Sequence, residues 1–162
     1  MSNVDDFIQA NERYAAAFTK GDLPKQPGKK VAVVVCMDAR LDPAKFLGLE
    51  EGDAHIIRNA GGRAADAIRS LVISQQLTGT REIAVIHHTD CGMLAFTEEE
   101  LHQKLHDELH VHAEIEFLPF TDLEQSVRDD VETIRTSPLL IPGLPVQGYV
   151  YDVHSGQLHE VN

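Results

Sequence analysis

Cysteine, tryptophan and basic residues are scarce in this sequence, and long apolar runs are missing. Its 162 residues include two cysteines, no tryptophan and 14 basic against 26 acidic residues, which gives a formal net charge of -12. Because such a surface repels a phosphate backbone or an anionic bilayer, we expect neither nucleic acid nor a membrane as a partner. No apolar stretch approaches the roughly 18 residues of a membrane span, and the acidic start MSNVDDFIQ does not resemble a signal peptide. We therefore expect a cytoplasmic protein.

The composition is that of a globular chain, with 43% hydrophobic and 25% charged residues. A chain of this length can bury one sizeable core, so we expect a single domain over residues 1–162. Within it, residues 1–29 are predicted to form an N-terminal helical arm and linker, and residues 30–162 an α/β core. Apolar spacing over 4–18 favours an amphipathic helix that could fold back or lie across a second subunit.

Strand signals alternate with helix signals, which predicts an α/β fold around a mainly parallel central sheet flanked by helices. The runs VAVVVC at 31–36 and IAVIHH at 83–88 are typical of strands buried on both faces. A shorter strand is expected at 54–57. The segments 148–153 and 157–161 predict a hairpin at the end of the sheet.

Helices are expected between these strands. Asp42 and Pro43 favour a short helix over 43–48, and apolar residues at helical spacing predict another over 63–78. Two later helices are predicted from capping boxes, in which a threonine caps the helix and a glutamate three residues later reaches back. These boxes are Thr97 with Glu100 and Thr121 with Glu124.

Both cysteines lie at the ends of predicted buried strands. Cys36 is the last residue of the first strand, His88 is the last residue of the strand at 83–88, and Cys91 lies three residues further on. Since ligands of open α/β sheets collect beyond the carboxyl ends of the strands, we expect these three side chains to meet. Two cysteine sulfurs and one histidine nitrogen are a recognised ligand set for catalytic zinc, with the fourth position open to water. We therefore predict one catalytic zinc ion bound by Cys36, His88 and Cys91.

Asp38 and Arg40 follow Cys36 at i+2 and i+4, so in a locally extended chain all three would face the metal. The Asp38 carboxylate can then orient a zinc-bound hydroxide, while Arg40 holds that carboxylate and keeps it ionised. Two thiolates cancel the charge of the ion, so the bound water should be less acidic than in a three-histidine site. Activity should favour alkaline pH. Release of Asp38 by Arg40 could give a reversible inactive state with Asp38 on zinc.

Three segments carry a resemblance to a known family. They are Cys36-Met37-Asp38-Ala39-Arg40, Arg58-Asn59-Ala60-Gly61-Gly62 and His88-Thr89-Asp90-Cys91-Gly92, and they look like the signature segments of the β-class carbonic anhydrases. The resemblance implies a compact zinc enzyme that reversibly hydrates carbon dioxide to bicarbonate and a proton. It implies Cys36, His88 and Cys91 as metal ligands and Asp38 with Arg40 as the catalytic dyad.

The same resemblance implies a homodimer or tetramer in which the first helix embraces the partner. Two features depart from common family patterns. Many members have serine at the position of Ala39, and the chain has no tryptophan, which makes the bicarbonate-regulated subgroup a poor match.

Ala60, Gly61 and Gly62 are candidate substrate-binding residues. Paired glycines before a helix let backbone amides approach a small anion such as bicarbonate, and the helix N-terminus adds partial positive charge. A tight turn without a ligand is the alternative interpretation.

Other functions stay open on sequence alone. The same zinc chemistry could hydrolyse carbon disulfide or carbonyl sulfide, or the cysteines could hold a non-catalytic zinc ion or form a labile disulfide. His87 could in principle replace His88 as a ligand. A second histidine group could shuttle protons, hold adventitious metal or form a solvated helix face; it comprises His102, His106, His110 and His112.

Overall fold

The computed structural model describes residues 2–162 and contains one five-stranded sheet of order β2-β1-β3-β4-β5. Neighbours from β2 to β4 pair in parallel, and β5 pairs antiparallel with β4. The prediction of a mainly parallel sheet that ends in a hairpin is therefore confirmed. The strands are β1 (Val31–Cys36), β2 (Ala54–Asn59), β3 (Glu82–His88), β4 (Val146–Tyr151) and β5 (Leu158–Val161).

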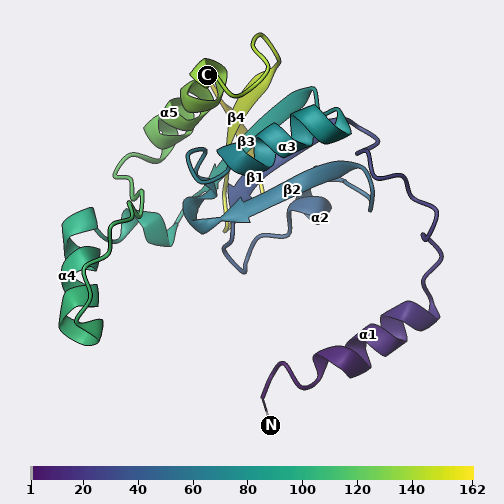
Figure 1. Cartoon of the computed structure of the whole chain (residues 1–162), viewed down its shortest axis with the longest axis horizontal. Coiled ribbons are helices and arrows are strands. Elements are labelled where there is room, and N and C mark those ends of the chain that lie inside the picture. Colours follow the sequence, from purple (N-terminus) through teal and green to yellow (C-terminus); the bar gives the residue numbers. More distant parts are fainter. Residues whose placement is uncertain (1) are drawn as a thin grey trace.

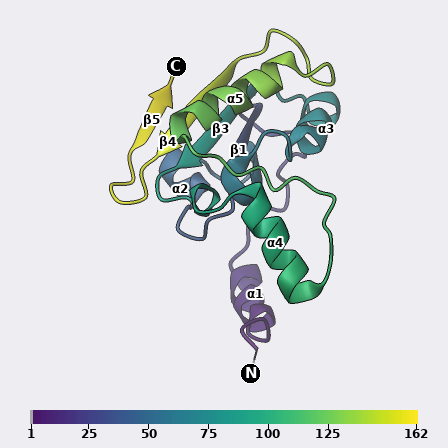
Figure 2. The ribbon, with the colours of Figure 1, turned by 90° about the vertical axis from the view of Figure 1, so that its left-hand side faces the viewer.

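The helices fall into two groups (Figures 1 and 2). α3 and α5 cover one face of the sheet, α2 lies on the other, and α1 and α4 project away from the body. Short 3-10 turns at Ala60–Gly62 and Gly92–Leu94 follow β2 and β3. The helices are α1 (Phe7–Ala16), α2 (Pro43–Leu47), α3 (Ile68–Thr78), α4 (Glu98–Leu109) and α5 (Leu123–Thr136).

β1 is buried on both of its faces, as its β-branched sequence predicts. Ala32 and Val34 belong to the apolar cluster under α3 and α5, while Val33 and Val35 belong to the cluster on the α2 side. Because successive side chains of a strand point to opposite faces, a strand between two helical layers has no polar face. β1 therefore ends, at Cys36, deep inside the molecule.

α3 begins at Ile68, five residues later than the apolar spacing predicts. Arg63 has extended backbone angles, φ -75 and ψ 132. The Asn59 carboxamide accepts a hydrogen bond from the Arg63 amide at 2.7 Å, and Asp130 accepts one from the Ala64 amide at 3.1 Å. These side chains satisfy the amides that a first helical turn would leave unpaired, so the chain stays extended here.

The two predicted capping boxes have different outcomes. Thr97 and Glu100 form a complete capping box at α4, as predicted. At α5 the N-cap is Asp122, whose side chain accepts from the Gln125 amide, so the box predicted with Thr121 is wrong. A carboxylate one residue closer to the helix competes successfully for the same amides.

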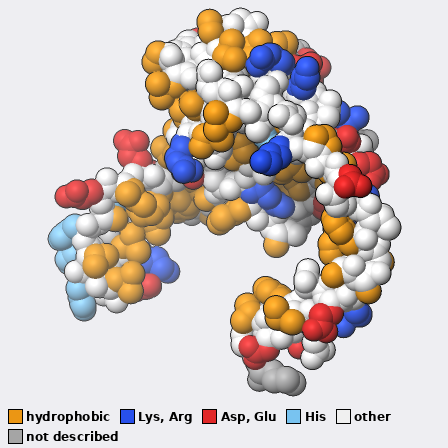
Figure 3. Space-filling model, turned by 45° about the vertical axis from the view of Figure 1, so that its right-hand side comes forward, with side chains coloured by type: hydrophobic (Ala, Val, Ile, Leu, Met, Phe, Trp, Pro, Cys, Tyr) orange, Lys and Arg blue, Asp and Glu red, His pale blue; other side chains and the backbone are white. Residues whose placement is uncertain are grey.

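The projecting helices leave apolar side chains uncovered. Neither α1 nor α4 contains a buried residue, and Phe7 and Ile8 of α1 are 63% and 69% exposed. The leucines of α4 are likewise not buried, and Leu109 is 62% exposed. Figure 3 shows apolar side chains along both arms. Among residues 2–162, no helix is both long and apolar enough to cross a bilayer.

Candidate metal centre

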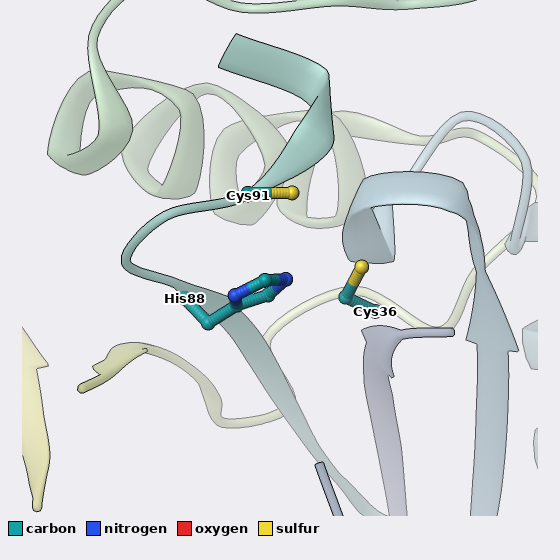
Figure 4. Close-up of side chains that lie close together, drawn as sticks. All are labelled: Cys36, His88 and Cys91. Carbon is teal, nitrogen blue, oxygen red and sulfur yellow. The ribbon is translucent and has the colours of Figure 1, made fainter. Parts of the chain in front are cut away.

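Cys36, His88 and Cys91 come together at the carboxyl ends of β1 and β3 (Figure 4). The two strands pair in parallel, so their ends lie side by side, and Cys91 follows three residues after the end of β3. The two sulfurs and one histidine ring nitrogen all lie within 4.8 Å of one another, and all three residues are buried. Donors this close can be reached from one point by zinc bonds of about 2.0–2.3 Å.

His88 is oriented for ligation by its neighbour. Its Nδ1 donates a hydrogen bond to the Thr89 carbonyl at 2.7 Å, which leaves the lone pair on Nε2. Nε2 is buried and has no hydrogen-bond partner among the described residues. An unsatisfied buried polar atom costs about 1–3 kcal/mol, and a bound cation would remove that cost. The donor set therefore fits a metal ion.

The two sulfurs influence each other's protonation. Both cysteines are free thiols, and the hydrogen bond between them lowers the pKa of Cys36 and raises the pKa of Cys91. The pair thus gives up one proton easily and the second with difficulty. A divalent cation favours the doubly deprotonated form, so metal binding and loss of the second proton are coupled.

Asp38 faces the candidate ligands and is held by Arg40. Its Oδ2 lies 3.7 Å from His88 Nε2. Arg40 donates to Oδ1 through Nε at 3.0 Å and to Oδ2 through Nη2 at 2.7 Å, and these bonds hold the pKa of Asp38 far below its usual range. The expected extended chain is wrong here: the Arg40 amide donates to Asp38 Oδ1, which closes a turn.

Two residues join this site that the sequence did not assign to it. Arg40 also donates to Asp90, to Oδ2 at 2.8 Å and to the carbonyl at 2.9 Å, so it bridges the segments after β1 and β3. The Arg58 guanidinium donates to the carbonyls of Cys36, Leu41 and Asp38. Both residues lie within the signature segments quoted above, and this was the signal that could have found them.

The turn Ala60–Gly62 lies against the first ligand. After the Cys91 thiol, which has the largest effect, the Gly61 backbone also helps to lower the pKa of Cys36. Gly62 has φ +65, and a Cβ added there would lie 2.9 Å from the Cys36 amide nitrogen. Since α3 starts only at Ile68, the helix N-terminus predicted beside the glycines is not there.

A cavity of about 420 Å³ opens onto two of the three candidate ligands, Cys36 and Cys91. Asp38, Ala60 and Gly61 also line it. The rest of its wall is mostly apolar and includes Leu101 of α4 and Phe117 of the segment after α4; none of these wall residues was predicted. An apolar wall beside a polar donor cluster suits a small uncharged molecule.

The other histidines stand apart from the donor set. His87 is fully buried, and its ring binds Ser126, Asp130 and the Gly62 carbonyl instead. On α4, His102 pairs with Glu98 at 3.3 Å, and the His106 ring contacts the His112 ring. Figure 3 shows this group at the outer edge of its arm.

Comparison with known proteins identifies similar chains. Residues 31–158 match the family model described as carbonic anhydrase. The sequence is 44% identical to beta-carbonic anhydrase 1 of Mycobacterium tuberculosis over 99% of both chains. A crystal structure of carbonic anhydrase from Streptococcus mutans has a TM-score of 0.95 and 51% identity, covering 100% of this chain and 99% of that one. The carbon disulfide hydrolase of an Acidianus strain is 34% identical over 98% of this chain and 89% of its own length.

Proposed function

The chain belongs to the β-carbonic anhydrase family and catalyses the reversible hydration of carbon dioxide, and we propose that one zinc ion on Cys36, His88 and Cys91 serves this reaction. The observation that carries the proposal is the convergence of three buried donors within 4.8 Å, with His88 Nε2 otherwise unpartnered. When bound, zinc supplies a Lewis acid that makes water nucleophilic near neutral pH.

We propose that Asp38 and Arg40 form the catalytic dyad. The Asp38 carboxylate lies 3.7 Å from His88 Nε2 and can accept the hydrogen of the attacking oxygen, which aims the lone pair of that oxygen at carbon dioxide. Arg40 keeps the carboxylate ionised and holds its rotamer. Asp90, on the other side of the guanidinium, keeps Arg40 in that position.

We propose that Ala60, Gly61 and Gly62 form the floor of the substrate site. Ala60 and Gly61 line the cavity, and Gly62 supports the turn from behind against Cys36. Carbon dioxide would lie against the apolar wall, and departing bicarbonate would leave through the open side of the cavity.

Carbon disulfide hydrolysis is the second candidate function. A carbon disulfide hydrolase is among the relatives, and a mostly apolar cavity wall would also accept this linear molecule. A non-catalytic zinc site is less well supported, because the donor group comprises three residues and Asp38 is engaged by Arg40. Structural zinc sites use four protein donors.

We infer that the protein is a homodimer or tetramer and that α1 lies across a partner subunit. The helix has no buried residue within its own chain, yet it carries large apolar side chains. We also propose a single domain over 1–162, with residues 1–29 as arm and linker and 30–162 as the zinc-binding core. A cytoplasmic location fits both free thiols, which a reducing compartment preserves.

The test is stopped-flow hydration of carbon dioxide, with the zinc content of each preparation measured in parallel. Asp38→Asn should lose at least about 100-fold in kcat/KM while zinc is retained. Cys91→Ala should lose both zinc and activity. Lys104→Ala, on the exposed face of α4, serves as the matched control. Full activity of zinc-free Cys91→Ala contradicts the proposal, and hydrogen sulfide release from carbon disulfide without carbon dioxide hydration would favour the second candidate.

A further inference from the structure

A buried ionic network lies beside the metal centre. The Asp130 carboxylate of α5 accepts four hydrogen bonds: from Arg63 Nε and Nη2 at 2.9 Å each, and from the Ala64 amide and His87 Nε2 at 3.1 Å each. The side chains of Arg63 and Asp130 are only 14% and 3% exposed. Burial works against ionisation of Asp130, but its bonds to His87 and Arg63 still hold its pKa below the usual range. Because buried ion pairs add little net stability, this pair invites a functional explanation.

One side of the network holds the turn Ala60–Gly62, called the glycine turn below. His87 Nε2 shares its one hydrogen between Asp130 and the Gly62 carbonyl, which lies 3.2 Å away. Asp130 also accepts from the Ala64 amide, two residues after Gly62. The backbone is therefore held by hydrogen bonds on both sides of Arg63, at Gly62 and at Ala64. Gly62 lies against the backbone of Cys36. The network therefore fixes the position of the glycine turn relative to this candidate ligand.

The other side of the network reaches the cavity wall. Arg63 Nη1 donates to the Leu118 carbonyl at 2.7 Å, and the Leu118 amide donates to Glu98 Oε1 at 2.7 Å. Leu118 has φ +59, a strained conformation for a branched side chain that persists only where its surroundings impose it. Both of its backbone polar groups are thus bound by side chains from elsewhere in the chain. Its neighbour Phe117 lines the reaction cavity.

We propose that Arg63 is a positioning residue for carbon dioxide hydration, which uses Asp130 as its anchor to set Phe117 against the cavity and the glycine turn against Cys36. This inference rests on the proposed function. Arg63 touches neither the candidate ligands nor the dyad. It acts by holding Phe117, in the wall of the cavity, at a fixed distance from the substrate. A wall that contacts the substrate equally in the ground and transition states affects KM more than kcat.

The test compares three variants of the full-length protein. Arg63→Gln removes the ion pair and the bond to Leu118. Arg63→Lys keeps a cation for Asp130 but cannot span Asp130 and Leu118 together, because an ammonium is a point charge and a guanidinium a fork. Arg128→Gln is the matched control, since it removes an exposed arginine on α5 that pairs with Glu124.

For both Arg63 variants we expect KM for carbon dioxide to rise about 10-fold with kcat within about twofold of wild type and zinc content unchanged. Amide hydrogen exchange over residues 115–120 should accelerate in both. Arg63→Lys should unfold near the wild-type temperature, which separates positioning from stability and keeps the test decisive if Arg63→Gln folds poorly. Arg128→Gln should change none of these quantities.

A double variant tests whether Arg63 changes KM through Phe117. If Arg63 acts through the wall, Phe117→Ala alone should raise KM, and adding Arg63→Lys should raise it by much less than the product of the two single effects. Wild-type KM and wild-type exchange in Arg63→Lys would overturn the inference, as would fully multiplicative effects. Should the wild-type protein fail to hydrate carbon dioxide, the proposed function fails, whereas amide exchange still decides whether Arg63 orders the wall.

Discussion

His87 and His88 are consecutive residues of β3, yet their rings bind different partners. The His88 ring lies with Cys36 and Cys91, and its Nδ1 is bound to the Thr89 carbonyl. The His87 ring binds Ser126 and Asp130 of α5. Since alternate residues of a strand point to opposite faces, a shift of one residue would exchange a candidate metal ligand for a structural histidine.

This relationship predicts opposite consequences for two adjacent substitutions. His88→Ala should abolish zinc binding and activity, because one of three donors is lost. His87→Ala should retain zinc but lower the free energy of unfolding by about 1–3 kcal/mol, since Asp130 and Ser126 lose a buried partner. Zinc analysis and urea unfolding of both variants check the prediction. Zinc loss from His87→Ala alone would reverse the assignment.

Removal of the metal should destabilise the protein. A ligand at 1,000 times its Kd that binds only the folded chain adds about 4.1 kcal/mol, and for a chain of this size that is about 8–16 °C in Tm. Calorimetry before and after treatment with a chelator measures the shift, and re-addition of zinc should restore it. Cys91→Ala provides the control, because its Tm should not respond to the chelator.

The glycine turn should be intolerant of a side chain. Gly62→Ala places a Cβ 2.9 Å from the Cys36 amide nitrogen in a backbone with φ +65, so we expect a loss of about 2–5 kcal/mol together with weaker zinc binding. Gly79→Ala is the matched control: it has φ +81 but open space around the added atom. It should lose only about 1–2 kcal/mol and keep its zinc. Equal losses in the two variants would contradict the packing argument.

The buried carboxylate of Asp130 should make stability depend on acid pH. Its pKa is lower in the folded chain than in the unfolded one, because the bonds from His87 and Arg63 outweigh burial. Its contribution is therefore complete above the unfolded value of about 3.9 and is lost as pH falls toward the folded value. Asp130→Asn should be less stable than wild type at pH 7, and the difference should shrink below about pH 4. Urea unfolding at several pH values measures this; a constant difference would disprove it.

The apolar face of α1 should determine assembly. Replacing Phe7 and Ile8 with serine removes two large exposed apolar side chains without touching the sheet. We expect the oligomer to dissociate, with a lower mass in light scattering coupled to gel filtration. The double variant Glu12→Gln and Arg13→Gln, on the same helix, should assemble like wild type. An unchanged mass after the serine substitutions would place the subunit contact elsewhere.

Much of the fold followed from local sequence. The β-branched run of β1, the Pro43 start of α2 and the Thr97 capping box each predicted an element that is present. Boundaries were wrong where a distant side chain intervened. The start of α3 moved to Ile68 because Asp130, 66 residues from Ala64, binds the backbone there.

The convergence of Cys36, His88 and Cys91 could be predicted from sequence, because short motifs at strand ends bring their donors to one edge of the sheet. Their convergence needed only the parallel pairing of β1 and β3. The cavity wall and the Arg63 network were not readable, since Phe117 and Asp130 lie in segments with no motif of their own. Such contacts join residues far apart in the chain. Their energy comes from burial and hydrogen bonding that exist only once the layers have packed, and so only the tertiary structure could decide them.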